Sequence, residues 1–536
     1  MKNRILNFIF FIFIFIQNNF GIDPNPILSR GKDVYTSSGK VSYLVDNKFS
    51  SQSWSVKNNS WIAIKLDSCP SKVFFTWNCP DYAWSNELSP AKCPNSISFP
   101  VNYNFLISDN STNGEDGDWQ IVDSIRNNIV CTRGHLLDCT NAKWLKMAII
   151  KGGGTIDEIE VFDASNNKDD TWFFVGTSIT ANAFKGTPPA LNFADVVNSK
   201  HKDYTPSMIR GGIGCISSSD FVGNLSKYLK MAGNVHFWAI EMGTNDAWGG
   251  SNANVNTFKN NLQIVIDSCR KYGIEPIIAR VLATNQSLAN WQVHPDFLKA
   301  VDELTEKNNL IKGPDLYTWF LAHPNDLNSD GVHPNASGAA SIQRLWAEKM
   351  DSLYGGCIAS EIIPYIQINQ DNDTLLAYIS AFEGDTIKIK PQSIDNGTWA
   401  WTGPNNFSSY DKDIILNNVT YDEEGYYIVS FTNENSCVTQ YPFKLKIKWK
   451  PSAIDKIKEK KYNLYIKSQN KATLVLNIDA IPKYTQLQII NIEGKIMLQK
   501  NNLNRENYIC LNLPKGIYVV KTIIDKEIYN DKIILF

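Results

Sequence analysis

The chain has 536 residues, a length that allows about three or four domains. It contains 52 basic and 54 acidic residues, so its formal net charge at pH 7 is −2. Charges of opposite sign that are this evenly matched give no reason to expect a nucleic acid or another polyanion as a partner.

The N-terminus, residues 1–21, is typical of a secretory signal peptide. Lys2 and Arg4 precede an apolar stretch at residues 5–16, which is too short to span a bilayer comfortably. No small-x-small cleavage site follows, so an uncleaved anchor is the alternative. Because no other long apolar run occurs, we expect a soluble mature chain without a membrane span.

The cysteines indicate disulfides. Ten cysteines in an exported chain favour disulfide bonds over metal sites. Cys131, His135 and Cys139 superficially resemble a metal cluster, but three ligands without a Cys-x-x-Cys pair favour a disulfide over zinc. We expect no metal and no cofactor. Five cysteines precede residue 140 and cannot all pair among themselves: Cys69, Cys79, Cys93, Cys131 and Cys139.

Residues 28–165 have an all-β pattern. Apolar and polar side chains alternate at residues 61–66 and again at 158–162, which is typical of sandwich strands. Together with Trp54, these segments resemble a discoidin or galactose-binding jelly roll. The resemblance implies a β-sandwich of a kind that often holds sugars through aromatic residues on loops.

Three aromatic residues of this range are candidates for such a sugar-binding platform. Trp77, Tyr82 and Trp84 lie in a polar segment bounded by cysteines. The alternative is that these rings pack beneath loops. For Trp54 and Trp61 a place in the core is favoured.

Residues 170–355 alternate between strand and helix patterns. Between the second and third strands, a helical face runs from Phe258 to Cys269 and is closed by Gly273. This alternation predicts a doubly wound, three-layer α/β core. Three apolar runs are too short for helices and fit buried parallel strands: residues 171–175, 236–240 and 277–281.

Polar motifs follow the predicted strands, at the carboxyl edge of the sheet, where active sites of α/β proteins lie. Ser178 comes after the first strand and Asn245 after the second, while Asp330 and His333 precede the last helix. A hydroxyl nucleophile, an amide donor and an acid–base pair are the groups that acyl transfer requires. Taken singly, each residue is more often a helix cap or a turn residue.

With these motifs, residues 170–355 resemble the SGNH/GDSL hydrolase family of esterases and deacetylases. The resemblance implies a flavodoxin-like core in which Ser178 is the nucleophile, His333 the base and Asp330 the acid that orients it. It also implies an oxyanion hole formed by the Ser178 N–H, the Asn245 side chain and a further backbone N–H. Thr177 stands where the family usually has aspartate.

That further N–H falls within residues 210–215, where the register of the family's second motif is ambiguous. One alignment makes Gly214 the donor and the other makes it Cys215. Because only a main-chain N–H is needed, cysteine can serve if its backbone angles allow it. Arg210 stands where the family usually has asparagine.

Residues 357–450 resemble an immunoglobulin-like module. Trp401 is a candidate core tryptophan, and Tyr427 is placed where a tyrosine corner is expected. Cys357 and Cys437 are positioned to join the edges of the module. We assign it the role of a spacer.

Residues 456–536 resemble the C-terminal sorting domain of type IX secretion. The specific signature is Gly-Ile-Tyr-Val-Val-Lys at residues 516–521, preceded by a hairpin turn at 493–495. The resemblance implies passage through the type IX secretion machinery and a secreted or cell-surface location. The alternative is one more small β-sandwich.

The sequence therefore predicts a secreted serine esterase that removes acyl groups, acetyl above all, from an extracellular polysaccharide. This choice of substrate rests on the domain architecture. A lipase or general esterase for lipids or small esters is one alternative, although no broad apolar lid is visible. A carbohydrate-binding surface adhesin with an inactive hydrolase domain is the other.

Overall fold

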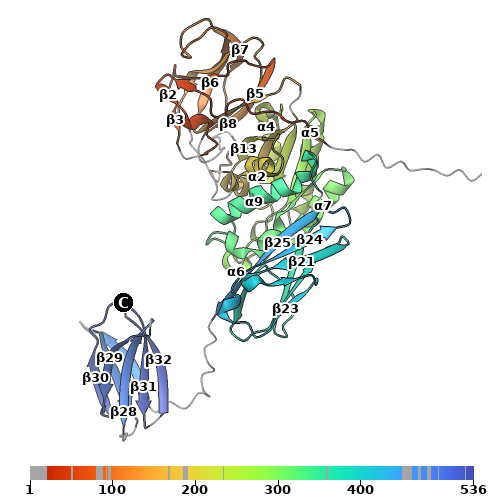
Figure 1. Ribbon diagram of the computed structural model, residues 1–536. Helices are drawn as coiled ribbons and strands as arrows, with labels where there is room; N and C mark the ends of the chain where they lie inside the picture. The colour runs from red at the N-terminus through yellow and green to blue at the C-terminus, as the bar shows by residue number, and fades with distance from the viewer. Residues whose placement is uncertain are drawn as a thin grey trace, which may run out of the picture. The chain divides into compact units, whose positions relative to one another are not determined.

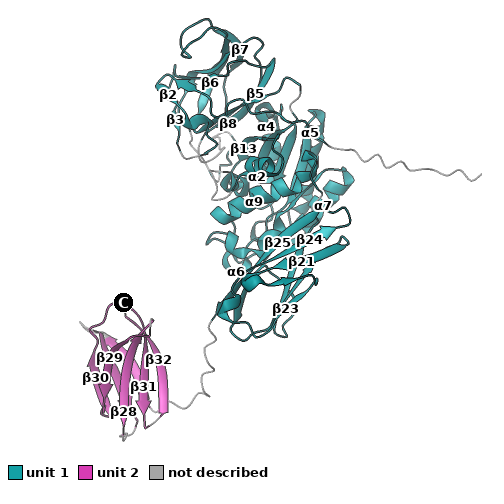
Figure 2. Ribbon diagram, viewed as in Figure 1, with its two compact units in different colours: residues 1–448 teal, residues 449–536 magenta. Residues whose placement is uncertain are grey.

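The computed structural model divides the chain into two units, residues 1–448 and 449–536 (Figure 2). The predicted signal peptide lies, except for Gly21, outside the described residues. No helix within the described residues is long and apolar enough to cross a membrane. The structure describes residues 21–49, 52–79, 88–91, 93, 98–166, 169–184, 191–232, 234–357, 360–448, 462–468, 472–479, 484–492, 494–525 and 527–535.

The N-terminal part of unit 1 consists of antiparallel sheets (Figure 1). Their strand orders are β2-β1-β4-β9-β6-β7, β11-β5-β8 and β10-β3. The alternation at residues 61–66 and 158–162 correctly predicts β4 and β11, while the jelly-roll assignment stays a prediction. The strands are β1 Val34–Thr36, β2 Gly39–Val41, β3 Trp54–Ser55, β4 Trp61–Lys65, β5 Lys72–Asn78, β6 Pro100–Ser108, β7 Gln120–Ile125, β8 Thr132–Asp138, β9 Trp144–Gly152, β10 Thr155–Ile156 and β11 Glu158–Asp163; a short 3₁₀ helix is η1 Tyr43–Val45.

A five-stranded parallel sheet forms the centre of unit 1, in the order β13-β12-β14-β15-β16. Numbered along the chain this is the order 2-1-3-4-5 of doubly wound, flavodoxin-like sheets, as predicted. The five strands end at the same edge of the sheet because they are parallel. They are β12 Thr171–Gly176, β13 Ser207–Gly212, β14 Phe237–Glu241, β15 Glu275–Arg280 and β16 Lys312–Asp315.

Helices cover both faces of this sheet (Figure 1). On β12, Trp172 and Phe174 point into one buried cluster while Phe173 and Val175 point into the other, as alternation along a strand requires. The first cluster includes residues of α1, α2, α8 and α9, and the second includes residues of α3, α4, α5 and α7. The helices are α1 Ser178–Ala183, α2 Phe193–Lys200, α3 Ser218–Gly223, α4 Leu225–Ala232, α5 Val255–Lys271, α6 Gln286–Ala289, α7 Pro295–Lys307, α8 Leu316–Ala322 and α9 Ala336–Lys349, with 3₁₀ turns at η2 Trp248–Gly250, η3 Pro324–Asp326 and η4 Asp351–Tyr354.

The N-terminal sheets and the central sheet share a hydrophobic core. Phe74, Leu88 and Phe162 belong to the same buried cluster as Phe173 of β12 and Ile209 of β13. The two regions are therefore packed against each other through apolar side chains and do not merely lie next to each other along the chain.

A buried ion pair crosses this junction. The Arg210 guanidinium donates to both carboxylate oxygens of Asp157, at 2.9 and 3.1 Å, and to the carbonyl of Cys79 at 3.0 Å. Both side chains are almost inaccessible to solvent, with exposed fractions of 6% for Arg210 and 0% for Asp157. Arg210 thus joins the two regions.

The C-terminal part of unit 1 has two further sheets, β18-β17-β20-β23 and β19-β25-β24-β21-β22. Trp401 is buried, the Tyr427 hydroxyl donates to the carbonyl of Glu423 at 3.3 Å, and Cys357 is bonded to Cys437, all as predicted. The immunoglobulin-like assignment stays a prediction. The elements are β17 Ile363–Ile368, β18 Thr374–Leu375, β19 Tyr378–Phe382, β20 Ile387–Gln392, β21 Gly397–Thr402, β22 Ser408–Ser409, β23 Ile414–Leu416, β24 Gly425–Asn433 and β25 Val438–Lys448, with η5 Pro404–Asn406 and η6 Tyr421–Glu423.

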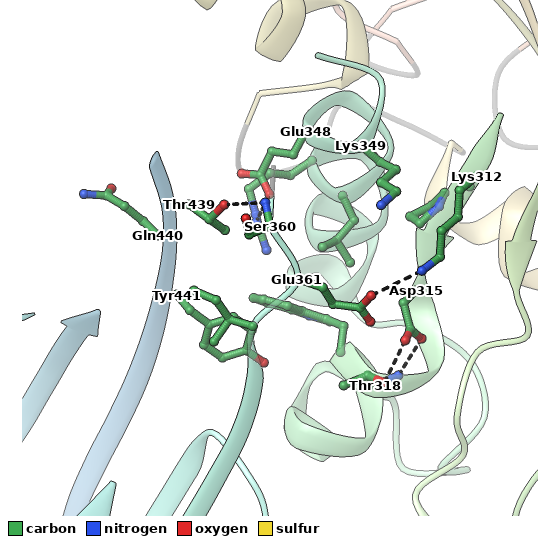
Figure 3. Close-up of a pocket in the computed structure, with 16 residues that line it drawn as sticks. Lys312, Asp315, Thr318, Glu348, Lys349, Ser360, Glu361, Thr439, Gln440 and Tyr441 are labelled. Atoms are coloured by element: carbon green, nitrogen blue, oxygen red, sulfur yellow. Dashed lines mark hydrogen bonds and ion pairs between the residues drawn. The ribbon is translucent and has the colours of Figure 1, made fainter. Parts of the chain in front are cut away.

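A pocket of about 120 Å³ lies where β25 meets the central sheet (Figure 3). Lys312 donates to Glu361 at 3.4 Å, and the Ser360 N–H donates to the hydroxyl of Thr439 at 2.9 Å. Asp315 accepts from Arg280 at 2.7 Å. The Lys312–Glu361 pair therefore connects the central sheet to the C-terminal part of unit 1.

Unit 2 consists of the sheets β26-β27-β30 and β29-β28-β31-β32, which enclose a core of their own. The signature at residues 516–521 lies on β31, and the predicted hairpin connects β28 to β29. The strands are β26 Tyr462–Ser468, β27 Ala472–Ile478, β28 Thr485–Asn491, β29 Ile496–Asn501, β30 Glu506–Cys510, β31 Gly516–Ile524 and β32 Glu527–Leu535.

Candidate active site

Ser178 lies at the carboxyl end of β12 and opens α1. Thr177 caps this helix, since its side chain accepts a hydrogen bond from the Ile179 N–H. A β-carbon on the preceding Gly176 would come within 2.2 Å of the carbonyl oxygen of Glu241 on the neighbouring strand. The turn that presents Ser178 therefore requires glycine at position 176.

The structure brings Ser178, His333 and Asp330 into one hydrogen-bonded series. The Ser178 hydroxyl oxygen lies 2.8 Å from Nε2 of His333, and Nδ1 of His333 lies 2.7 Å from Oδ2 of Asp330. Oδ1 of Asp330 accepts from the N–H groups of Val332 and His333 at 2.9 and 3.0 Å. A single loop before α9 thus presents both the acid and the base.

These contacts also lower the pKa of Asp330. Partial burial alone would raise the pKa of Asp330, but the hydrogen bonds from the His333 side chain and from two backbone N–H groups outweigh burial. The pKa of Asp330 therefore lies below its usual value, which keeps the carboxylate charged beside the imidazole.

Asn245 follows β14 and points toward the loop after β13. Its Nδ2 donates to the carbonyl of Ile216 at 2.8 Å, which orients the amide and leaves its second N–H available. The N–H of Ile213, in the same loop, donates to the carbonyl of Gly176 at 2.9 Å. The loop from Ile213 to Ile216 is therefore hydrogen-bonded to the end of β12 at one side and to the Asn245 side chain at the other.

Both candidates for the second backbone donor lie in this loop. Within the described residues, the N–H groups of Gly214 and Cys215 donate to no protein atom. Cys215 has a left-handed backbone with φ of 64°, which costs a residue with a β-carbon about 1 kcal/mol. Its sulfur is bonded to Cys93, 122 residues earlier in the sequence.

Glu241, the last residue of β14, is a site residue that the sequence reasoning missed. Its Oε2 accepts from the hydroxyls of Thr177 at 3.0 Å and Thr180 at 3.3 Å. Burial raises the pKa of Glu241, against the lowering effect of the Thr177 hydrogen bond. A carboxyl group is therefore present beside the nucleophile although position 177 is threonine. The signal for it was an acidic residue directly after the apolar run at residues 236–240.

The prediction that Trp77 belongs to a sugar-binding platform is wrong. Trp77 is fully buried, and its indole N–H lies 3.4 Å from Nε2 of His135 in the core of the N-terminal sheets. Because β5 is buried on both faces, the ring cannot reach a ligand. Tyr82 and Trp84 lie outside the described residues.

The expectation of disulfides is confirmed by two bonds, Cys93–Cys215 and Cys357–Cys437. Cys93 bonds outside the N-terminal region, in agreement with the odd number of early cysteines. The disulfide favoured at Cys131 and Cys139 is corrected, because these two residues are not bonded to each other. The two strands β5 and β8 bring other pairs together: the Cys79 N–H donates to the carbonyl of Cys131 at 2.9 Å, and Cys69 contacts Cys139 through its side chain.

The chemistry available to this site is nucleophilic acyl transfer. A serine hydroxyl lies within hydrogen-bond reach of an imidazole whose other nitrogen is held by a carboxylate. This is the arrangement of a serine hydrolase site.

The C-terminal region of the chain matches a known protein family. Residues 468–535 match the model of the family described as "Secretion system C-terminal sorting domain". The prediction of a type IX sorting tail is thereby confirmed, and the chain carries a signal for secretion or cell-surface attachment. No curated protein sequence matches the chain significantly.

Solved structures show partial similarities. A lipase/acylhydrolase from Enterococcus faecalis is 20% identical, with 34% of this chain and 94% of that chain covered and a TM-score of 0.28. An acetyl-xylooligosaccharide esterase variant from Geobacillus is 15% identical, covering 34% and 93%, with a TM-score of 0.29. A chitosan-binding module of a chitosanase/glucanase from Paenibacillus sp. IK-5 is 20% identical, covering 25% and 99%, with a TM-score of 0.20.

Proposed function

We propose that the protein is a secreted serine esterase that removes acyl groups, acetyl above all, from an extracellular polysaccharide. The observation that carries the proposal is the series Ser178, His333 and Asp330, with contacts of 2.8 and 2.7 Å. Residues separated by 155 positions in the sequence meet in the order that an activated serine needs.

In the first half of the reaction, His333 removes the Ser178 proton while the serine oxygen attacks the ester carbonyl. Asp330 holds the proton on Nδ1 of His333, so that Nε2 can accept, and stabilises the imidazolium that forms. The carbonyl oxygen becomes an oxyanion, which the N–H groups of Ser178, of Gly214 or Cys215, and of the Asn245 side chain stabilise. When this intermediate collapses, the bond between the former carbonyl carbon and the sugar oxygen breaks, and the His333 imidazolium donates its proton to that oxygen, so that the sugar leaves as an alcohol.

In the second half, water replaces the sugar. His333 removes a proton from this water, which attacks the acyl-serine carbonyl, and the same donors stabilise the second oxyanion. The acid is released and Ser178 regains its proton. No step calls for a cofactor.

An exposed tryptophan supports a glycan as substrate. Trp248 follows Asn245 by three residues, is 55% exposed, and lies 5.2 Å from the ring of Trp291. The segment before Trp291 is joined to the acid loop, because the Asn285 N–H donates to the carbonyl of Gly331 at 2.7 Å. An accessible indole between two loops of the site offers a flat apolar surface for a sugar ring.

The test uses the mature full-length protein and a chromogenic acetate ester. Replacement of Ser178 by alanine is expected to lower kcat by at least about 10³-fold, and equal rates for the two proteins would favour the inactive adhesin. Acetate release from acetylated glycans is expected to exceed fatty-acid release from long-chain esters, and the reverse preference would favour a lipase.

A matched pair of variants tests the glycan contact. Trp248→Ala is expected to lower kcat/KM on an acetylated polymer about 5-fold, since stacking contributes roughly 1 kcal/mol, and to leave the small ester unaffected. Tyr272→Ala is the control, because Tyr272 is similarly exposed, at 54%, but lies after α5, near the opposite edge of the sheet. Equal effects of the two variants would exclude Trp248 as a sugar contact.

A further inference from the structure

The loop that carries the second oxyanion donor is fixed at both ends. At its start, Ile213 is hydrogen-bonded to Gly176. At its end, Ile216 accepts from Asn245, and both the N–H and the hydroxyl of Ser218 donate to the carboxylate of Asp246, the hydroxyl at 2.6 Å. Between these anchors, the direction of two N–H groups depends on the backbone of Gly214 and Cys215 alone.

Position 215 has the backbone of a glycine but the side chain of a cysteine. Its φ of 64° lies in the left-handed region, which residues with a β-carbon rarely adopt. Three of the four preceding residues are glycine, namely Gly211, Gly212 and Gly214. The reason for cysteine at 215 is therefore its side chain, and that side chain forms the disulfide with Cys93.

The other end of the disulfide is also anchored. The Cys93 N–H donates to the carbonyl of Pro90 at 2.8 Å, and Leu88, only 2% exposed, lies in the core shared by the N-terminal sheets and the central sheet. The disulfide thus ties Cys215 to a segment outside the central sheet.

We infer that the Cys93–Cys215 disulfide is a positioning device for catalysis: it holds residue 215 in the left-handed conformation and so aims the backbone N–H of Gly214 or Cys215 at the oxyanion. The inference rests on the proposed function. Without the disulfide, a residue with a β-carbon at 215 relaxes to negative φ, and the donor turns away. Glycine at 215 keeps the conformation without the bond.

Two variants that differ by a single methyl group test this. Both C93S/C215A and C93S/C215G lack the disulfide, but only the alanine variant carries a β-carbon at 215. With the chromogenic acetate, C93S/C215A is expected to lose about 10- to 100-fold in kcat with KM unchanged, since one oxyanion donor is lost or weakened. C93S/C215G is expected to recover most of that loss. C357S/C437S, which removes the other disulfide, is the control and keeps full kcat.

Thermal unfolding separates positioning from stability. Both variants lack the same cross-link, so their melting temperatures are expected to fall by similar amounts while their kcat values differ. If the two variants are equally impaired, or equally active, the positioning role is overturned.

Crystal structures of the two variants give a result that does not depend on ester hydrolysis. The proposed function fails if the wild-type protein shows no hydrolysis that depends on Ser178. The positioning inference fails if the alanine at position 215 of C93S/C215A retains the left-handed backbone conformation. If no ester is hydrolysed at all, the effect of the disulfide on the backbone is still supported when alanine moves to negative φ and glycine does not.

Discussion

Replacing Asp330 by asparagine is expected to damage the site more than replacing it by alanine. In the structure, Oδ1 of Asp330 accepts from two backbone N–H groups and Oδ2 faces Nδ1 of His333. In Asp330→Asn the amide oxygen must take the place of Oδ1, because only an oxygen can accept from those N–H groups. The amide NH₂ then faces Nδ1, so that His333 carries its proton on Nε2, toward Ser178, and cannot act as a base.

The contacts and exposure set the expected magnitudes. Asp330→Ala removes a charge-assisted hydrogen bond worth about 1.5–3 kcal/mol, which corresponds to roughly 10- to 100-fold in rate. Water can replace the carboxylate, since the Asp330 side chain is 49% exposed. Asp330→Asn also stabilises the inactive tautomer of His333, so kcat/KM is expected to fall by about 10³- to 10⁴-fold.

The assay is kcat/KM for a chromogenic acetate ester at pH 7, with and without added formate. Formate is expected to restore part of the activity of the alanine variant, because a small carboxylate fits the vacated place, and to leave the asparagine variant inactive. An asparagine variant as active as the alanine variant, or rescued equally by formate, would refute the reasoning about the tautomer.

Two further predictions concern stability. Burial raises the pKa of Asp170, which accepts hydrogen bonds from Tyr354 and Trp172, to about 7. A carboxyl group whose pKa is raised in the folded state stabilises the protein most at low pH. The free energy of unfolding of the wild type, relative to that of Asp170→Asn, is therefore expected to fall by about 4 kcal/mol between pH 4 and pH 8. Denaturant titration at both pH values checks this, and a difference that does not change with pH would contradict it. Arg210→Met is expected to lower the free energy of unfolding by about 3–5 kcal/mol, because the buried Asp157 carboxylate then lacks the Arg210 guanidinium. Adding Asp157→Asn to the same chain is expected to restore part of this loss. A loss below about 1 kcal/mol would show that the pair does not stabilise the junction.

Local patterns explain why much of the fold was readable from the sequence. The apolar runs at residues 171–175 and 236–240 are short, continuous and followed by polar motifs, and they are β12 and β14. The helical face from Phe258 to Cys269 lies within α5. Ser178 and Asn245 each follow one of these strands, and because parallel strands end at one edge of the sheet, both lie at the same edge.

Glu241 and Trp77 show where such patterns fail. The acidic residue after the apolar run marks the position of Glu241, but no local pattern shows that its carboxyl faces the hydroxyls of Thr177, which caps α1, and Thr180, which lies in α1. Trp77 occurs in a segment with many polar residues, which suggests exposure, but β5 is covered by other elements on both sides. In both cases the side chain contacts residues of other helices or strands, which a local sequence pattern does not identify.

The sequence by itself determined the order of the elements, the candidate residues Ser178, Asp330 and His333 and the sorting tail, because each depends on spacing along a few turns or strands. Only the tertiary structure decided that the Glu241 carboxyl lies beside Thr177, that Cys93 pairs with Cys215, and that Arg210 meets Asp157 across a buried junction. The last two pairs are separated by 122 and 53 residues. Contacts over such distances arise when apolar faces of different elements pack together, and the local periodicity of a sequence does not specify which faces meet.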